Sequence, residues 1–180
     1  VYKRQLIDDT KIEGALLIGS DGIFSTVRRQ LELPGDRLNY VGLCVVLGIV
    51  NDEILKIPLA KRRIFETVDG TTRIYAMPFT KNSTMWQLSF PCSEDTAKKY
   101  TRDASTLKAE ISRRCGNWHD PIPEMLTKTP LNCMSGYPVY DRELLETDVL
   151  RPKASISRRV TIIGDAAHPM TPFKAQGANQ

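Results

Sequence analysis

The fold class of this protein can be inferred from one stretch near the end of the sequence, Arg159-Val-Thr-Ile-Ile-Gly-Asp-Ala-Ala-His-Pro-Met-Thr-Pro-Phe-Lys-Ala-Gln-Gly-Ala-Asn179. The apolar run from Val160 to Ile163 predicts a buried strand, and Gly164 and Asp165 follow at its carboxyl end. A proline-punctuated loop and small residues that open a helix come next. In α/β sheets, nucleotide-like ligands bind at strand ends, and helix N-termini attract negative charge. The stretch therefore indicates a ligand-binding corner in a parallel α/β layer.

A second corner of the same kind lies near the start of the chain, in Gly19-Ser-Asp-Gly-Ile-Phe-Ser-Thr-Val-Arg28. It follows the apolar run 15–18, which predicts a strand, and it opens a predicted helix from Ser25 to Leu31. The glycines on both sides of Asp21 permit a close approach of the backbone to a ligand. The residues alone leave two interpretations open: Asp21 belongs to a binding site, or it only caps the helix.

Between these corners the hydrophobic pattern changes to a period of two, from Asn39 to Pro91, which predicts an antiparallel sheet with one buried face. The dipeptide Asp69-Gly70 between two such runs predicts a hairpin. Ser93 is a predicted N-cap of a helix whose apolar stripe continues to Ile111, and prolines 121 and 123 are expected to end the helical region. Residues 137–145 are predicted to return to the sheet.

Both corners resemble sequence motifs of the FAD-dependent aromatic monooxygenases, the para-hydroxybenzoate hydroxylase-like flavoprotein hydroxylases. Residues 21–28 match that family's Asp-Gly-x-x-Ser-x-Val-Arg pattern position by position, and residues 164–179 resemble its second FAD fingerprint. The resemblance implies an α/β fold with an α+β insertion, a FAD/NAD(P)-binding layered fold interrupted by an antiparallel-sheet substrate domain. We expect FAD-binding parts at 1–36 and 151–180, and the substrate domain at 37–150.

The resemblance also implies which residues bind the cofactors FAD and NAD(P)H. Asp165 would hydrogen-bond the ribityl chain, the loop 169–172 would border the isoalloxazine, and the helix after Gln176 would direct N–H groups at the pyrimidine edge. The implied cofactor-binding residues are Asp21, Gly22, Arg28, Gly164, Asp165, Pro172, Gly177, Ala178 and Asn179. No catalytic residue is assigned, because the oxidising chemistry belongs to the cofactor, and His168 is therefore not interpreted as a general base. Neither histidine has partners at metal-ligand spacing, so no metal site is expected.

The implied activity is hydroxylation of a small aromatic or ring-bearing molecule with NAD(P)H and O2. Epoxidation, halogenation and oxidation without oxygen transfer stay open as alternatives on the same scaffold, as does a non-catalytic flavin-fold module. Inward faces of the antiparallel sheet are expected to shape specificity. Trp86, Met77 and Phe79 are candidates for that role, with core packing as the commoner role for all three.

Composition restricts the other classes of function. The chain has 180 residues and a formal net charge of +4 with scattered basic clusters, so no nucleic-acid partner is expected. No apolar run approaches the roughly 20 residues of a membrane span, so membrane association is not indicated. The four cysteines lack short paired spacing, which favours reduced thiols in a cytoplasmic protein.

One expected element is missing from the sequence. A dinucleotide-binding fold normally starts with a strand followed by Gly-x-Gly-x-x-Gly, and this chain lacks that triplet. We therefore expect a fragment of a longer enzyme, truncated at both ends. On its own, this fragment is expected to be inactive.

Overall fold

A computed structural model of the chain describes residues 2–5, 11–55, 64–145 and 159–174. The chain divides into two compact units. One consists of Val1–Asn39 together with Tyr140–Gln180, and the other is the continuous segment Tyr40–Val139. The first unit is therefore assembled from the two ends of the sequence, and the second is inserted between them.

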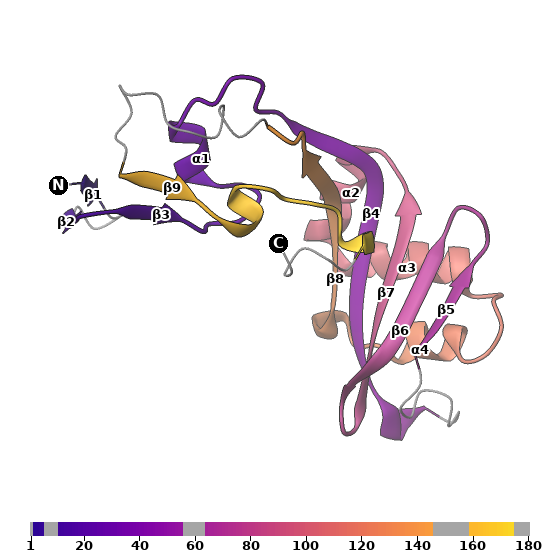
Figure 1. Cartoon of the computed structure of the whole chain (residues 1–180). Helices are drawn as coiled ribbons and strands as arrows, with labels where there is room; N and C mark the ends of the chain where they lie inside the picture. The colour runs from indigo at the N-terminus through magenta and orange to yellow at the C-terminus, as the bar shows by residue number, and fades with distance from the viewer. Residues whose placement is uncertain (1, 6–10, 56–63, 146–158, 175–180) are drawn as a thin grey trace. The chain divides into compact units, whose positions relative to one another are not determined.

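The first unit holds two small sheets (Figure 1). Strand β1 (Tyr2–Gln5) pairs antiparallel with β2 (Lys11–Gly14), a pairing that the sequence pattern did not predict. Strand β3 (Leu17–Gly19) pairs parallel with β9 (Val160–Ile162), so the two predicted corners of the chain belong to one α/β layer. The predicted fold class is confirmed here.

Helix α1 (Thr26–Gln30) packs on this parallel pair. Residue 19 allows the contact because it has no side chain: a Cβ atom there would lie 2.8 Å from Cβ of Val27 and 2.9 Å from Cγ2 of Ile162. The small core of this unit consists of Val27, Leu31, Leu33, Val160, Ile162 and Ala166. Two 3-10 turns follow β9, η4 (Gly164–Ala166) and η5 (Pro172–Lys174).

The second unit is built on a five-stranded sheet in the order β5-β6-β7-β4-β8. Its strands are β4 (Leu38–Asn51), β5 (Phe65–Val68), β6 (Arg73–Thr80), β7 (Ser83–Pro91) and β8 (Met134–Arg142). The pairs β4–β7, β5–β6 and β6–β7 are antiparallel, and the turn between β5 and β6 contains the predicted Asp69-Gly70 dipeptide. The short 3-10 helix η1 (Asp52–Ile54) follows β4. The predicted antiparallel sheet is confirmed.

The helical region differs from the prediction in two places. The expected single helix is divided at Asp103 into α2 (Glu94–Arg102) and α3 (Ala104–Cys115), because the Asp103 carboxylate accepts hydrogen bonds from the first amides of α3. The prolines 121 and 123 do not end the helical region but begin α4 (Ile122–Lys128). Proline is tolerated in the first turn of a helix, where its missing N–H has no intrahelical partner. The 3-10 helix η3 (Leu131–Cys133) leads into β8.

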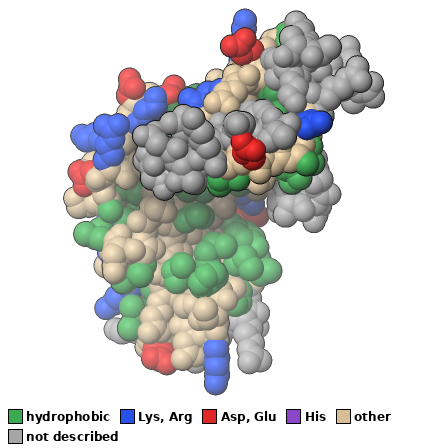
Figure 2. Space-filling view, turned by 90° about the vertical axis from the view of Figure 1, so that its left-hand side faces the viewer, with side chains coloured by type: hydrophobic (Ala, Val, Ile, Leu, Met, Phe, Trp, Pro, Cys, Tyr) green, Lys and Arg blue, Asp and Glu red, His purple; other side chains and the backbone are tan. Residues whose placement is uncertain are grey.

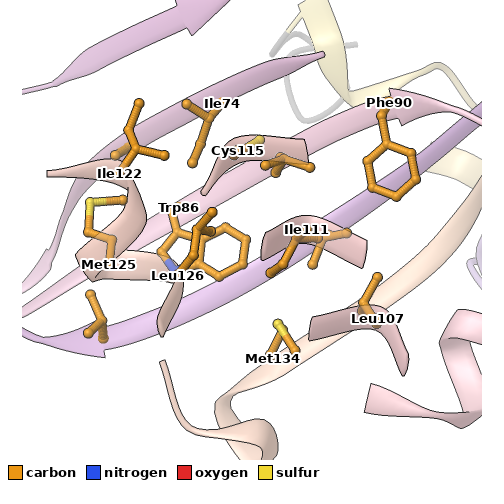
Figure 3. Close-up of a cluster of buried hydrophobic side chains, with 14 of the residues drawn as sticks. Ile74, Trp86, Phe90, Leu107, Ile111, Cys115, Ile122, Met125, Leu126 and Met134 are labelled. Carbon is orange, nitrogen blue, oxygen red and sulfur yellow. The ribbon is translucent and has the colours of Figure 1, made fainter. Parts of the chain in front are cut away.

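Helices α2, α3 and α4 cover one face of the sheet and enclose the main core (Figures 1 and 3). Trp86, Leu88 and Phe90 alternate along β7 and point to this face, where all three are fully buried. The core includes Leu107, Ile111, Ile122, Met125 and Leu126 from the helices. The buried indole of Trp86 donates from Nε1 to Oγ1 of Thr129 at 2.9 Å, which satisfies its polar atom.

The opposite face of the sheet is half-buried along part of its length, whereas Val45 and Ser89 on the same face are buried. Met77 and Met85 are cross-strand partners there, and Leu47 and Gln87 form the adjacent pair along β4 and β7. Figure 2 shows hydrophobic side chains gathered on the part of the molecule that carries this sheet. Among the helices of the described ranges, none combines the length and the hydropathy that a bilayer-spanning segment requires.

Candidate FAD site

The parallel pairing of β3 with β9 brings the two sequence motifs to the same edge of one sheet. Gly19 is the register partner of Ile162, and the backbone N–H of Ile163 donates to the carbonyl of Gly19 at 2.9 Å. Asp21 and Asp165 therefore follow the carboxyl ends of adjacent parallel strands. Motifs that lie about 140 residues apart in the sequence become neighbours, at the edge where α/β sheets bind nucleotides.

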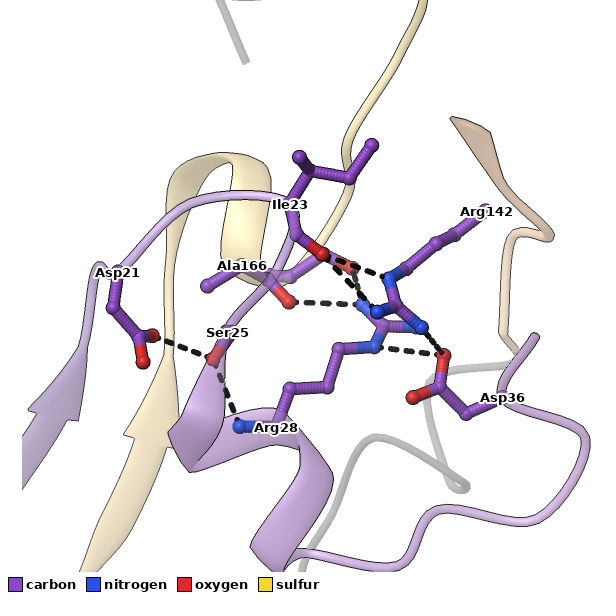
Figure 4. Close-up of polar contacts among 8 residues, drawn as sticks. Asp21, Ile23, Ser25, Arg28, Asp36, Arg142 and Ala166 are labelled. Atoms are coloured by element: carbon purple, nitrogen blue, oxygen red, sulfur yellow. Dashed lines mark hydrogen bonds and ion pairs between the residues drawn. The ribbon is translucent and has the colours of Figure 1, made fainter. Parts of the chain in front are cut away.

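The Asp21 carboxylate organises the start of α1. Its Oδ1 atom accepts from Oγ of Ser25 at 2.5 Å, and its Oδ2 atom accepts from the amides of Thr26 at 2.7 Å and Val27 at 3.2 Å. Oγ of Ser25 in turn accepts from the amide of Arg28 at 2.8 Å (Figure 4). Three of the free amides at the helix start are thereby satisfied. The helix-capping interpretation of Asp21 holds, and a cofactor contact of Asp21 stays a prediction.

These hydrogen bonds predict how Asp21 titrates. Burial pulls its pKa upward, but the bonds from Ser25, Val27 and Thr26 outweigh burial and hold the pKa below the ordinary 3.8. Because the folded pKa is depressed, the stability that Asp21 contributes is fully present above the unfolded pKa. It is lost as the pH falls through the folded pKa. A carboxyl-carbon NMR titration should show a midpoint below 3.8, moved upward by Ser25→Ala; a midpoint at or above 3.8 in the unaltered protein would contradict the capping geometry.

The chain after β9 turns sharply at Gly164 and exposes Asp165. Gly164 has a φ of +57°, a left-handed conformation that favours glycine, and its carbonyl accepts from the amides of Ala167 and His168, both at 2.9 Å. Ala166 is fully buried and fixes the turn in the core, while Asp165 is exposed. The turn thus presents a carboxylate at the edge of the sheet.

Arg28 was predicted to bind cofactor, and the structure places its guanidinium inside the protein. The side chain is fully buried, at 1% exposure, and Nη1 donates to the carbonyl of Ala166 at 2.9 Å and also to that of Ala167. Arg28 therefore connects the helix of the first motif to the turn of the second. A direct contact between Arg28 and a cofactor stays a prediction.

Two residues of this region were missed in the sequence. Oδ1 of Asp36 accepts from Nε of Arg28 at 3.0 Å and from Nη1 of Arg142 at 2.7 Å. Asp36 and Arg142 lie 106 positions apart, and no local pattern links them. The only sequence signal is a lone charged residue after the turn at Gly35 and another at the end of a strand, which is too common to be informative.

The remaining predicted site residues are described only in part. Pro172 begins the turn η5 and is exposed. Gly177, Ala178 and Asn179, together with the helix predicted after Gln176, lie outside the described residues.

The three candidate specificity residues of the sheet differ in burial and do not all lie on the same face. Trp86 is fully buried in the core on the helix-covered face, so it has the core-packing role that the sequence favoured. Met77 lies half-buried on the opposite face, and Phe79 is 59% exposed near the end of β6.

Comparison with known proteins shows the family. The sequence model of a family described as FAD binding domain matches residues 1–180, the whole chain. The chain belongs to the FAD-binding domain family of FAD-dependent monooxygenases. The resemblance stated from the two motifs is thereby confirmed.

The relatives have low sequence identity to this chain but align over nearly all of it. Aurachin C monooxygenase/isomerase from Stigmatella aurantiaca is 29% identical, and the alignment covers 98% of this chain and 42% of that protein. Zeaxanthin epoxidase from Nicotiana plumbaginifolia is 27% identical, with coverages of 96% and 24%. The crystal structure of Klebsiella pneumoniae HpxO complexed with FAD and uric acid has a TM-score of 0.76 at 25% identity, with coverages of 95% and 41%. The chain thus spans less than half the length of the relatives it matches.

The residues present fit one part of an FAD molecule. Asp165 offers an exposed hydrogen-bond acceptor of the kind that sugar-like hydroxyl groups require. A Cβ atom on Gly22 or Gly164 would meet nothing within 4 Å, so the backbone of both turns is open on that side. Nδ1 of His168, three residues after Asp165, is buried and has no hydrogen-bond partner within the described part of the chain. Two turns with an accessible backbone and an exposed carboxylate suit a polar ligand that bears hydroxyl groups.

Proposed function

We propose that the full-length protein is an FAD-dependent monooxygenase that uses NAD(P)H and O2 to hydroxylate an aromatic or ring-bearing small molecule. The carrying observation is the parallel β3–β9 pair, which brings the Asp21 and Asp165 turns to one edge within a chain that matches the FAD-binding family throughout. One similar solved structure supports this substrate class: the HpxO crystal structure contains FAD together with uric acid, a ring-bearing small molecule.

Each part of the chain has a separate task in this proposal. Residues 1–36 and 151–180 contribute to the FAD-binding domain, and residues 37–150 form the substrate domain, with the compact unit Tyr40–Val139 as its body. The half-buried sheet face with Met77 and Met85 is the part of that unit suited to contact an apolar ring, because the opposite face is filled by helices.

When bound, FAD would supply the redox chemistry, namely hydride uptake from NAD(P)H and activation of O2. The chain's own residues bind and orient it. The Asp165 carboxylate would accept a hydrogen bond from a hydroxyl of the ribityl chain, and the open turn at Gly164 would let the backbone approach that chain. Asp21 and Ser25 hold the start of α1, so the amides of that turn keep a fixed direction.

Epoxidation is the alternative that a specific observation favours, because zeaxanthin epoxidase is among the relatives. Halogenation and oxidation without oxygen transfer use the same cofactor, and a flavin-fold module without catalysis is the alternative from another class. The products distinguish them: a hydroxylase and an epoxidase both insert one atom from ¹⁸O2, as an alcohol or phenol and as a three-membered ether respectively, a halogenase product carries halogen, and an oxidase releases H2O2.

The decisive experiment uses purified full-length protein. We expect a yellow protein with stoichiometric FAD, substrate-dependent consumption of NAD(P)H and O2, and one labelled oxygen atom in the product. Protein that is folded but neither retains nor rebinds FAD would refute the proposal. Retention of FAD without any NAD(P)H-dependent O2 uptake would leave the non-catalytic alternative.

Replacement of Asp165 by alanine is expected to weaken FAD binding to the full-length protein by roughly 1–3 kcal/mol, the cost of one lost hydrogen bond to a buried ligand group. Flavin fluorescence titration of deflavinated protein measures the change. Asp165→Asn keeps an oxygen acceptor and should lose less affinity. Asp95→Ala, at an exposed aspartate on α2, is the matched control and should bind like the unaltered protein. Equal affinity of Asp165→Ala and the control would refute the assigned role of Asp165.

A further inference from the structure

Two arginines and one aspartate form a buried network in the first unit (Figure 4). The side chains of Arg28, Arg142 and Asp36 are 1%, 7% and 12% exposed. Both arginines donate to the same carboxylate oxygen, Oδ1 of Asp36, at 3.0 and 2.7 Å. Asp36 follows α1, and Arg142 is the last residue of β8, so the network links segments from both ends of the chain.

Each guanidinium also holds the backbone of one motif. Arg28 donates to the carbonyls of Ala166 and Ala167, in the turn that carries Asp165. Arg142 donates from both Nε and Nη2 to the carbonyl of Ile23 at 3.1 Å, in the turn that follows Asp21. The two turns are therefore joined through Asp36, with Arg142 fixing one and Arg28 fixing the other.

The chemistry of the network requires arginine at both positions. A guanidinium presents its N–H groups in one rigid plane, so one side chain can reach a carbonyl and a carboxylate in fixed directions. A lysine ammonium has a compact charge on a flexible stem and does not fix two acceptors in this way. Arg142 uses three nitrogen atoms on two acceptors, Ile23 and Asp36.

The charges of the network explain why Asp36 is needed. Two guanidinium groups and one carboxylate sum to one net positive charge, and the carbonyl oxygens of Ile23, Ala166 and Ala167 supply the remaining acceptors. Without the Asp36 carboxylate, two like charges would stay buried beside each other with no counter-charge between them. The three side chains consequently act as one unit.

We propose that Arg142 and Asp36 are positioning residues of the FAD site: through Arg28 they set the spacing between the Asp21 turn and the Asp165 turn, and so preorganise both for the cofactor. This inference rests on the proposed function. It adds two residues, 106 positions apart, that belong to neither motif. Their effect on FAD acts through the turns and needs no contact with the cofactor.

The test compares full-length Arg142→Met, Arg142→Lys and Asp36→Asn with the unaltered protein. The readouts are the FAD dissociation constant of deflavinated protein and the visible circular dichroism of bound flavin, which reports the geometry around the ring. We expect Arg142→Met and Asp36→Asn to weaken FAD binding by about tenfold or more, the effect of one charged hydrogen bond. The flavin dichroism should change as well. Arg142→Lys keeps the charge and should recover only part of the affinity.

Arg29→Met is the matched control, because Arg29 is exposed on the same helix and its Nη2 atom donates to Oγ1 of the neighbouring Thr26. It should leave affinity and dichroism unchanged. If Arg142→Met does not fold, Arg142→Lys decides: a loss of affinity supports the proposal, and unaltered affinity and dichroism overturn it. Unaltered protein that binds no FAD would refute the proposed function itself. FAD bound equally well by every variant would refute only the positioning role.

Discussion

Replacement of Gly48 by valine is expected to destabilise the second unit by about 3 kcal/mol, the upper end of the usual cost of overpacking a core. Gly48 lies on β4 opposite Trp86 on β7. A Cβ atom at residue 48 would lie 2.2 Å from Cζ2 and 2.3 Å from Cε2 of the Trp86 indole. The indole cannot move aside, because it is fully buried and its Nε1 atom is bonded to Thr129.

The measurement is denaturant unfolding followed by tryptophan fluorescence. Both tryptophans, Trp86 and Trp118, lie in the unit Tyr40–Val139, so the signal reports this unit alone. The matched control is Ser135→Val, at an exposed position of the neighbouring strand β8, which should change the midpoint little. A Gly48→Val midpoint equal to that of the control would show that the indole has room to shift.

Replacement of Arg28 by methionine is expected to destabilise the turn after β9 in the first unit. Methionine fills much of the volume but leaves the carbonyls of Ala166 and Ala167 without their donor, at roughly 1–3 kcal/mol for each buried acceptor. The total loss of folding free energy is about 3 kcal/mol or more if no water molecule replaces the lost donor at either carbonyl. Asp36 keeps its bond to Arg142, so the loss should be concentrated in the turn after β9.

Hydrogen exchange followed by mass spectrometry measures this effect, because the first unit has no tryptophan. Peptides that cover β9 and the Gly164 turn should lose protection, including the Ile163 amide that bonds to Gly19. Arg29→Met, on the exposed side of the same helix, should exchange like the unaltered protein. Equal protection in both variants would mean that Arg28 does not hold the turn.

Much of the fold was predictable because its signals are local. The period of two from Asn39 to Pro91 predicted an antiparallel sheet with one buried face, and Asp69-Gly70 predicted the hairpin between β5 and β6. The helical errors also have a local cause. Asp103 and the pair of prolines at 121 and 123 are compatible with either a helix end or a helix start, and in the structure they stand at the starts of α3 and α4.

The candidate site was predictable to a lesser extent. The two motifs predicted that Asp21 and Asp165 lie in turns after buried strands, because a strand and the turn after it are encoded in about ten consecutive residues. The direction of the Arg28 side chain was not encoded there. A long side chain on a helix follows the acceptors that the rest of the chain supplies, and those acceptors are contributed by Asp36 and by the turn after β9.

The amino-acid order alone predicted the antiparallel sheet, the hairpin, the two turns and, through the motifs at those turns, the family, since period and turn chemistry act between residues close in sequence. The folded chain alone established that β3 lies beside β9, that Trp86 fills the core instead of a pocket, and that Arg28, Asp36 and Arg142 share one network. These features depend mainly on contacts between residues far apart in the sequence, such as Leu17 with Val160 and Asp36 with Arg142. Such contacts form only when many weak local preferences are satisfied together in one packed structure.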